Sequence, residues 1–143
     1  MNPKHHTSLK IAKQLVEAGI VIESESQWEV GGKLSGKQNA TLVLRNRPPS
    51  FVSADSAWSF YPAPIATELL ERLPAELIVE KVTYNLFIGV AETERGTEYY
   101  VGYADEFERE ELLSELQMCE LQPATLPNAL ALLLIRLTKD GLI

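Results

Sequence analysis

Cysteine and histidine are scarce in this chain, and their scarcity excludes several kinds of chemistry. Cys119 is the only cysteine, and the two histidines, His5 and His6, are adjacent. A single cysteine cannot form an internal disulfide, a Cys-x-x-Cys redox pair or a multi-cysteine zinc site. A hydrolytic triad needs a histidine held against its nucleophile, whereas we expect both histidines to lie in a flexible terminus, residues 1–6. The sequence therefore predicts no catalytic residue, no metal site and no cofactor.

Long hydrophobic runs are also missing. The longest apolar run, 129–135, is well short of the roughly 18 to 20 residues that a membrane-spanning helix requires. The first residues, Met-Asn-Pro-Lys-His-His-Thr, lack the apolar core of a secretion signal. We therefore expect a cytoplasmic protein without a membrane partner.

The length and composition are typical of one globular domain. The chain has 143 residues, of which 45% are hydrophobic and 23% are charged. A domain of this length buries enough surface to fold without a metal or a disulfide. We expect a single domain over residues 1–143.

Basic charge is scarce in the second part of the chain. Residues 1–50 carry seven basic and four acidic side chains, whereas residues 51–143 carry six basic and sixteen acidic ones. Such an acidic field repels nucleic-acid phosphates, so we expect no duplex nucleic acid as a partner. The acidic residues are densest around a predicted helix over 105–119. They either form a face for a basic partner or keep the protein soluble, and the candidates for that face are Glu108, Glu111 and Glu115.

The spacing of apolar residues predicts an α+β fold. Helical periodicity indicates a helix between Thr7 and Gly19, and short β-rich runs at 27–30 and 40–45 indicate a first hairpin. Pro64 suits the start of a second helix. A long strand over 77–90 and a returning strand over 98–104 indicate a second hairpin. Thr125 and Gly141 bound a last helix, whose apolar residues cover nearly its whole circumference. The order predicts a mainly antiparallel sheet of two hairpins, packed with about four helices, the C-terminal one buried.

A glycine-rich segment comes close to a phosphate-binding loop. Gly31, Gly36 and Lys37 match the Gly-x4-Gly-Lys part of that motif. The next residue is Gln38, where the motif needs Ser or Thr, and the sequence that follows predicts a strand, not a helix. We interpret this segment as the tip of a hairpin.

The most informative loop covers residues 46–63 and combines prolines with aromatic residues. Aromatic side chains on a proline-rigidified loop can stack on a base or anchor a protein interface, and an arginine beside them can meet a phosphate. The alternative is that Trp58 and Phe60 point inward from an edge strand and pin the loop to the core. The candidate binding residues are Arg45, Arg47, Trp58, Phe60 and Tyr61.

The order of several motifs resembles a class of small uncharacterised proteins encoded by bacteriophages and prophages. The motifs are the helix end 14–19, the strand around Trp28, the segment 61–74, the strand 100–103 and the closing helix 129–143. Segment 61–74 is similar to the Pro-Thr-x-Glu-Glu-Leu-Leu-x-x-Leu-Pro helix of that class. The acidic segment before the last helix is longer than is usual there. The resemblance implies a phage accessory protein in the cytosol of a bacterial host, and it assigns no catalytic residue.

These observations lead to two functional hypotheses. The first is a non-enzymatic phage-type binding protein that acts on a host process, as a counter-defence protein that sequesters a small signalling nucleotide or blocks a host protein. Its ligand would occupy a pocket of aromatic and cationic groups. The second is a homo-oligomeric assembly factor without a ligand, which would expose an apolar patch as a monomer.

Overall fold

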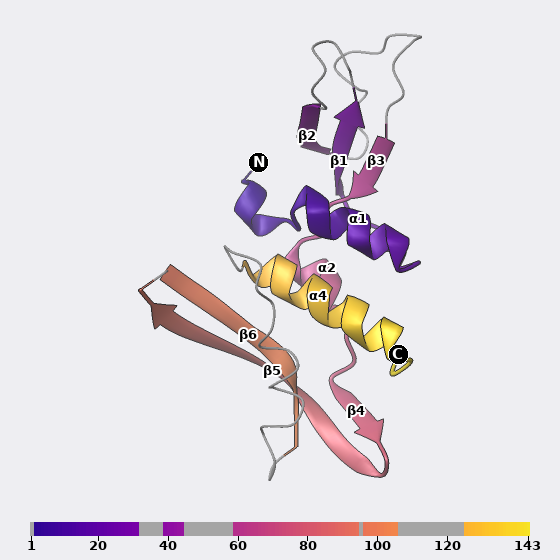
Figure 1. The fold of residues 1–143 in the computed structure, drawn as a ribbon, viewed down its shortest axis with the longest axis vertical. Coiled ribbons are helices and arrows are strands. Elements are labelled where there is room, and N and C mark those ends of the chain that lie inside the picture. The colour runs from indigo at the N-terminus through magenta and orange to yellow at the C-terminus, as the bar shows by residue number, and fades with distance from the viewer. Residues whose placement is uncertain (1, 32–38, 45–58, 95, 106–124) are drawn as a thin grey trace.

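The computed structural model describes residues 2–31, 39–44, 59–94, 96–105 and 125–143. In these ranges the strands form two separate antiparallel sheets of three strands, with α1 and α4 between them (Figure 1). The α+β class and the antiparallel pairing are confirmed, but the expected single sheet is in fact two. The elements, in chain order, are the 3-10 helix η1 (Pro3–His5), α1 (Leu9–Glu17), β1 (Ser26–Gly31), β2 (Asn39–Leu44), β3 (Ser59–Pro62), α2 (Ala66–Leu70), β4 (Glu76–Val79), β5 (Val82–Thr93), β6 (Gly96–Ala104) and α4 (Leu126–Lys139).

The first sheet has the order β2-β1-β3. Its hairpin is confirmed, with Gln27 opposite Val43. The third strand corrects the prediction of an irregular segment 46–63, because Ser59–Pro62 pairs with β1 and places Tyr61 opposite Trp28. Pro62 lies at the end of this edge strand. Its missing N–H therefore costs the sheet no hydrogen bond.

The second sheet has the order β4-β5-β6. The β5–β6 hairpin is confirmed and runs over nine residue pairs, from Asn85 with Ala104 to Thr93 with Gly96. The predicted single strand over 77–90 is wrong. The chain turns back at Glu80 and Lys81, which have φ angles of 51° and 68°, so that β4 pairs with the start of β5. These left-handed conformations are typical of a two-residue hairpin turn, in which Asn, Asp and Gly are the favoured residues. Glu and Lys do not predict such a turn.

Side chains at the helix ends explain where the helices begin and stop. Ser8 accepts a hydrogen bond from the backbone N–H of Ile11 at the start of α1, and Thr125 accepts one from that of Asn128 at the start of α4. Gly141 follows α4 with a φ of 71°, as its left-handed exit requires. Helix α2 begins at Ala66, after Pro64, because Glu68 accepts the N–H of Ile65 and so fixes the first turn there.

The described residues contain three α-helices rather than about four. The helix expected over 105–119 falls almost entirely on residues 106–124, which lie outside the described ranges. Among the described residues, no helix is both long and apolar enough to cross a bilayer.

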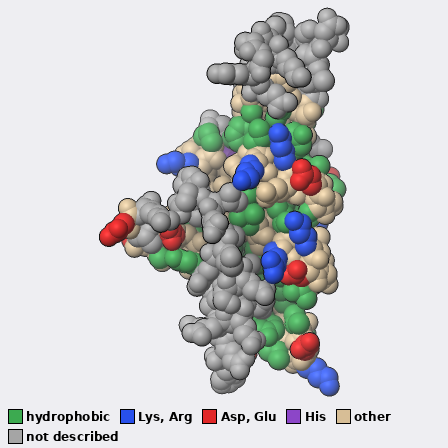
Figure 2. Space-filling view, viewed as in Figure 1, with side chains coloured by type: hydrophobic (Ala, Val, Ile, Leu, Met, Phe, Trp, Pro, Cys, Tyr) green, Lys and Arg blue, Asp and Glu red, His purple; other side chains and the backbone are tan. Residues whose placement is uncertain are grey.

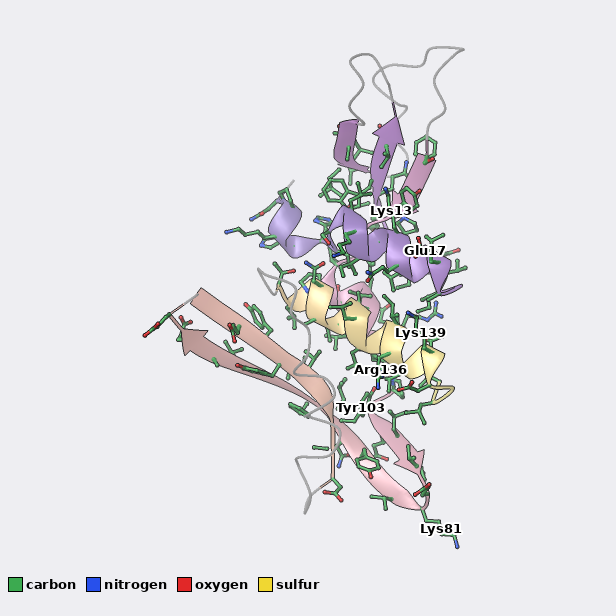
Figure 3. All side chains as sticks on the ribbon, viewed as in Figure 1. Lys13, Glu17, Lys81, Tyr103, Arg136 and Lys139 are labelled. Carbon is green, nitrogen blue, oxygen red and sulfur yellow. The ribbon has the colours of Figure 1, made fainter. Side chains whose placement is uncertain are left out.

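A central apolar cluster joins α1, α2, α4 and the second sheet. Helix α4 contributes most to it and packs against α1, α2 and β6. Tyr103 of β6 lies fully buried where the second sheet passes α4 (Figure 3). The buried residues of α4 are Pro127, Ala129, Leu130, Ala131, Leu133, Leu134, Ile135 and Leu137.

Candidate functional site

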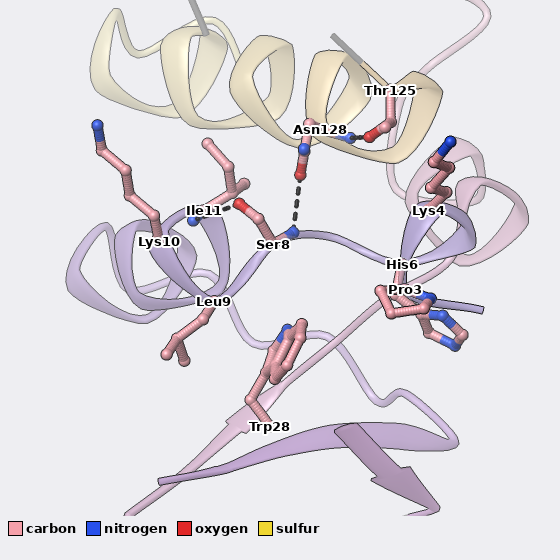
Figure 4. A pocket seen from close by; sticks show the side chains of 10 residues that line it. All are labelled: Pro3, Lys4, His6, Ser8, Leu9, Lys10, Ile11, Trp28, Thr125 and Asn128. Atoms are coloured by element: carbon pink, nitrogen blue, oxygen red, sulfur yellow. Dashed lines mark hydrogen bonds between the residues drawn. The ribbon is translucent and has the colours of Figure 1, made fainter. Parts of the chain in front are cut away.

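A cleft opens between the N-terminal residues, the start of α1 and the start of α4 (Figure 4). We call it the cationic cleft. Its volume is about 340 Å³, which lies within the range of small-molecule sites. The residues that line it are Pro3, Lys4, His6, Ser8, Leu9, Lys10, Ile11, Trp28, Thr125 and Asn128.

The N-terminal wall of the cleft makes hydrogen bonds within itself and with β1. Asn2 accepts the backbone N–H of Lys4 and starts the 3-10 helix η1. His6 is only 8% exposed. Its ring nitrogens lie 3.1 Å from the carbonyl oxygen of Asn2 and 3.2 Å from Oγ of Ser26. These contacts tie the terminus to β1, so Lys4 is carried on an ordered turn.

The contact between His6 and Ser26 resembles part of a hydrolytic site, but it is buried and a substrate cannot reach it. Ser26 is 6% exposed and does not line the cleft. The second ring nitrogen of His6 faces a backbone carbonyl, where a hydrolytic triad has a carboxylate. The contact therefore serves to fasten the N-terminus.

The floor of the cleft is the side chain of Trp28. Its indole N–H donates to the carbonyl of Thr7 at 2.8 Å, which fixes the ring against the turn before α1. The ring is half-buried, so part of its surface faces the cleft. An indole held in this way offers a rigid apolar surface on which a planar group can stack.

Hydrogen bonds across the cleft join the two helix starts. The backbone N–H of Ser8 donates to Oδ1 of Asn128 at 2.8 Å, over a sequence separation of 120 residues (Figure 4). Ser8 and Thr125 each accept the N–H of the third helical residue, so their helix starts are already capped. What remains for a ligand is the side-chain amide nitrogen of Asn128 together with the two lysines.

The charge of the cleft is opposite to that of the whole chain. The ionisable side chains among its described lining residues are Lys4, Lys10 and His6, and none of these residues is a carboxylate, although the chain has a net charge of −7. Figure 4 shows the two lysines on opposite sides of the opening. An anion in the cleft would meet cations from two elements and, among the described lining residues, no anionic group.

A second groove of about 800 Å³ continues the cleft toward the β5–β6 hairpin. Lys4, His6 and Thr125 line both spaces, and His5 adds another basic group. Its far wall is formed by Thr97 and Tyr99 of β6. Among the described residues no carboxylate lines this groove, but Thr97 of its far wall donates to Oε1 of Glu92 at 2.9 Å.

Within the part of the chain that the structure describes, two buried polar atoms have no hydrogen-bond partner: the hydroxyl of Thr7 and one carboxylate oxygen of Glu29. Each costs on the order of 1–3 kcal/mol of stability. Neither residue lines the cleft or the second groove, so we assign no ligand contact to them.

The candidates identified from the sequence lie elsewhere or outside the described ranges. Phe60 and Tyr61 are on the edge strand β3, and neither lines the cleft. Phe60 is 46% exposed, and the ring of Tyr61 lies 5.5 Å from the ammonium group of Lys13. The residues outside the described ranges are Arg45, Arg47, Trp58, Glu108, Glu111 and Glu115.

Sequence reasoning missed the cationic cleft because residues far apart in the chain build it. The one local signal was the group Lys4, His5 and His6 just before a helix cap. Among the described residues, no group of three or more His, Cys, Asp or Glu side chains is arranged to hold a metal ion. Comparisons of the chain with protein-family models, with curated proteins and with solved structures find no match.

Proposed function

We propose that this chain is a non-enzymatic binding protein that holds a small phosphorylated, nucleotide-like molecule in the cationic cleft. The observation that carries the proposal is the composition of the cleft. Lys4 and Lys10 line the cleft together with a fixed indole, and none of the described residues that line it is a carboxylate, in a chain of net charge −7. Lysine is a common phosphate-binding residue, and an indole face stacks on any base.

The physiological role that we propose is that of a phage-type accessory protein acting on a host process. Sequestration of a signalling nucleotide needs only binding, with no chemical step. The cleft fits this role because its cations bind phosphate without activating a nucleophile. Blocking of a host protein through Glu108, Glu111 and Glu115 is the competing mode.

The first measurement is native mass spectrometry of protein purified gently from bacterial cells, followed by calorimetric titration with adenosine monophosphate and with inorganic phosphate. We expect the double variant Lys4→Ala/Lys10→Ala to weaken binding of both by about 100-fold, because each charged contact contributes roughly 1.5–3 kcal/mol. The matched control, Lys81→Ala/Lys139→Ala, removes the same charge from exposed positions outside the cleft and leaves binding intact.

The variant Trp28→Leu separates base recognition from phosphate recognition. Loss of stacking is expected to weaken nucleotide binding by about tenfold, and inorganic phosphate binding by much less. Equal weakening by the cleft variant and by the control variant would show that the charge acts non-specifically. Absence of binding of either probe at millimolar concentration contradicts the proposal.

A further inference from the structure

The β5–β6 hairpin extends beyond the rest of its sheet as a two-stranded ribbon. We call this part, residues 86–93 and 96–103, the β-arm (Figure 1). Strand β4 pairs with β5 only over Val82–Asn85. One more hydrogen bond, from Leu86 N–H to the carbonyl of Ala75 at 2.9 Å, follows that pairing. Past it, no described residue pairs with this edge of β5.

The β-arm lacks the features that protect a solvent-exposed strand. Residues 86–91 of β5 read Leu-Phe-Ile-Gly-Val-Ala and carry no charge and no proline. Ile88 is 42% exposed and Val90 is 61% exposed. Unpaired edges normally carry lysine, proline or a bulge that discourages pairing, and a two-stranded hairpin alone is marginally stable in water. The free edge of the β-arm is therefore suited to accept another strand.

The geometry points to a second copy of this chain as the occupant, with the two β-arms paired antiparallel about a twofold axis at Gly89. Successive residues of a strand direct their N–H and C=O groups to opposite edges. The N–H of Leu86 points to Ala75, on the edge of β5 that does not pair with β6. Ile88, Val90 and Glu92 therefore direct their N–H and C=O groups to this same edge, which is free beyond Leu86. A strand that pairs with this edge must place, opposite these residues, residues whose own N–H and C=O groups point toward them. This condition limits the possible registers.

The register centred on Gly89 satisfies that condition. It places Ile88 opposite Val90 of the second copy, and Val90 opposite its Ile88. Because these are hydrogen-bonded pairs, both residues gain backbone partners that they lack in the monomer. The side chains of Ile88 and Val90 from both copies then lie on the same face of the joined sheet, where aliphatic cross-strand pairs are stabilising.

Nothing among the described residues of one chain requires glycine at position 89. Its φ angle is not in the left-handed region, and an added Cβ would meet Tyr100 Cβ at 3.7 Å, an ordinary contact. Glycine inside a strand often marks a place where another backbone approaches closely. In the proposed dimer, Gly89 faces itself across the axis in a non-hydrogen-bonded pair, where side chains of opposed residues are closest.

The charges of the β-arm agree with this register. Its tip carries the exposed carboxylates Glu92 and Glu94, and acidic side chains are visible at the end of the β-arm in Figure 2. With Gly89 at the axis, the two tips point in opposite directions and Glu92 lies opposite Leu86, so no carboxylate opposes another. A register centred on Val90 would instead pair Ile88 with Glu92, so Ile88 would lose the exposed apolar partner that the register centred on Gly89 gives it.

The paired segment is short, so the dimer should dissociate on dilution. Residues 87–91 of each copy form it, because the N–H of Leu86 already donates to Ala75, and this is fewer than the roughly 20 to 30 residues a side of a standard interface. We expect sedimentation velocity of the intact chain to show a sedimentation coefficient that rises with protein concentration. A chain that remains monomeric at every concentration overturns the proposal.

A cross-link tests the axis. In a Cys119→Ser background, Gly89→Cys places two thiols in a pair whose Cα atoms are about 4.5 Å apart, within disulfide range. We expect a covalent dimer on mild oxidation. The matched control Ile78→Cys, on β4 and 73% exposed, should cross-link at least tenfold more slowly. Equal rates for the two variants contradict an axis at Gly89.

Charge exchange tests the register. Ile88→Lys/Val90→Lys and Ile88→Glu/Val90→Glu each place like charges opposite one another, so each alone should lower the association constant at least tenfold. Mixed in equal amounts, they should form a heterodimer, because every opposed pair is then a lysine with a glutamate. A wild-type dimer that neither variant weakens, or a mixture that stays monomeric, overturns the assignment. The outcome is independent of ligand binding in the cleft, whose lining residues remain unchanged.

Discussion

At the scale of single residues, Tyr103 combines full burial with a hydroxyl that must find a partner. The hydroxyl donates to the carbonyl of Pro74, which joins β6 to the segment that follows α2. Burial raises the pKa of Tyr103 from 10.0 to about 12, because the interior disfavours the phenolate. The neutral form is thus favoured in the folded state.

This shift predicts a loss of stability at alkaline pH. Above pH 10 the unfolded tyrosine ionises while the folded one stays neutral up to about 12, so the contribution is complete below pH 10 and falls as the pH rises toward 12. We expect Tyr103 to lower the free energy of unfolding by about 1 kcal/mol between pH 9 and pH 11. Urea unfolding at both values measures it. Tyr103→Phe should show a smaller decrease over the same interval, and an equal decrease in both proteins argues against this origin.

Residue-level predictions from the sequence succeeded where the interaction is local. Thr125 caps α4 as predicted, because a cap depends on a hydroxyl and on the next three residues. The burial of His6 was not predictable, since it depends on Ser26, which is twenty residues away. The orientation of Trp28 toward Thr7 likewise depends on how β1 packs against the turn before α1.

At the scale of elements, the β4–β5 turn is the least favourable local structure. Glu80 and Lys81 both adopt left-handed conformations, which are costly for residues with a Cβ. Their sequence gives no turn signal, which explains why one long strand was expected over 77–90. The edge strand β3 was only the alternative interpretation of the loop, because its four residues are shorter than a recognisable periodic pattern, and Phe60 does not point inward as that alternative expected.

Replacement of this turn by Glu80→Asn/Lys81→Gly should stabilise the protein. Asn and Gly adopt the left-handed region readily, so we expect the free energy of unfolding to rise by about 1 kcal/mol. Denaturant unfolding measures the change. Lys81→Ala is the control, since alanine is as disfavoured there as lysine and should give no gain. Equal effects of the control and the Asn-Gly variant would contradict the strain argument.

At the scale of the whole molecule, α4 holds the apolar cluster together. Leu130 is fully buried at the centre of this helix, whereas Leu132, on the same helix, is only half-buried. We expect Leu130→Ala to lower the free energy of unfolding by about 3 kcal/mol and Leu132→Ala by about 1 kcal/mol. Urea unfolding of both variants provides the comparison. Similar losses in the two would show that the cluster is not centred on α4.

The cationic cleft belongs to this scale too, which is why the sequence does not reveal it. Its walls come from residues 3–11, 28 and 125–128, and the hydrogen bond between Ser8 and Asn128 spans almost the whole chain. Local patterns predicted the α+β class and both hairpins. How the helices pack between the two sheets, and therefore which side chains meet, depends on tertiary contacts that those patterns do not contain.

The position of α4 after the elements that it covers has a consequence for biosynthesis. A ribosome makes α1, α2 and the second sheet before it makes residues 126–139, yet the apolar sides of those earlier elements are buried against this helix. The growing chain therefore displays them to the cell until α4 has been made. Newly made copies should depend on chaperones that hold apolar segments, and a premature stop codon before residue 126 should give a product that is degraded, however complete its first sheet is.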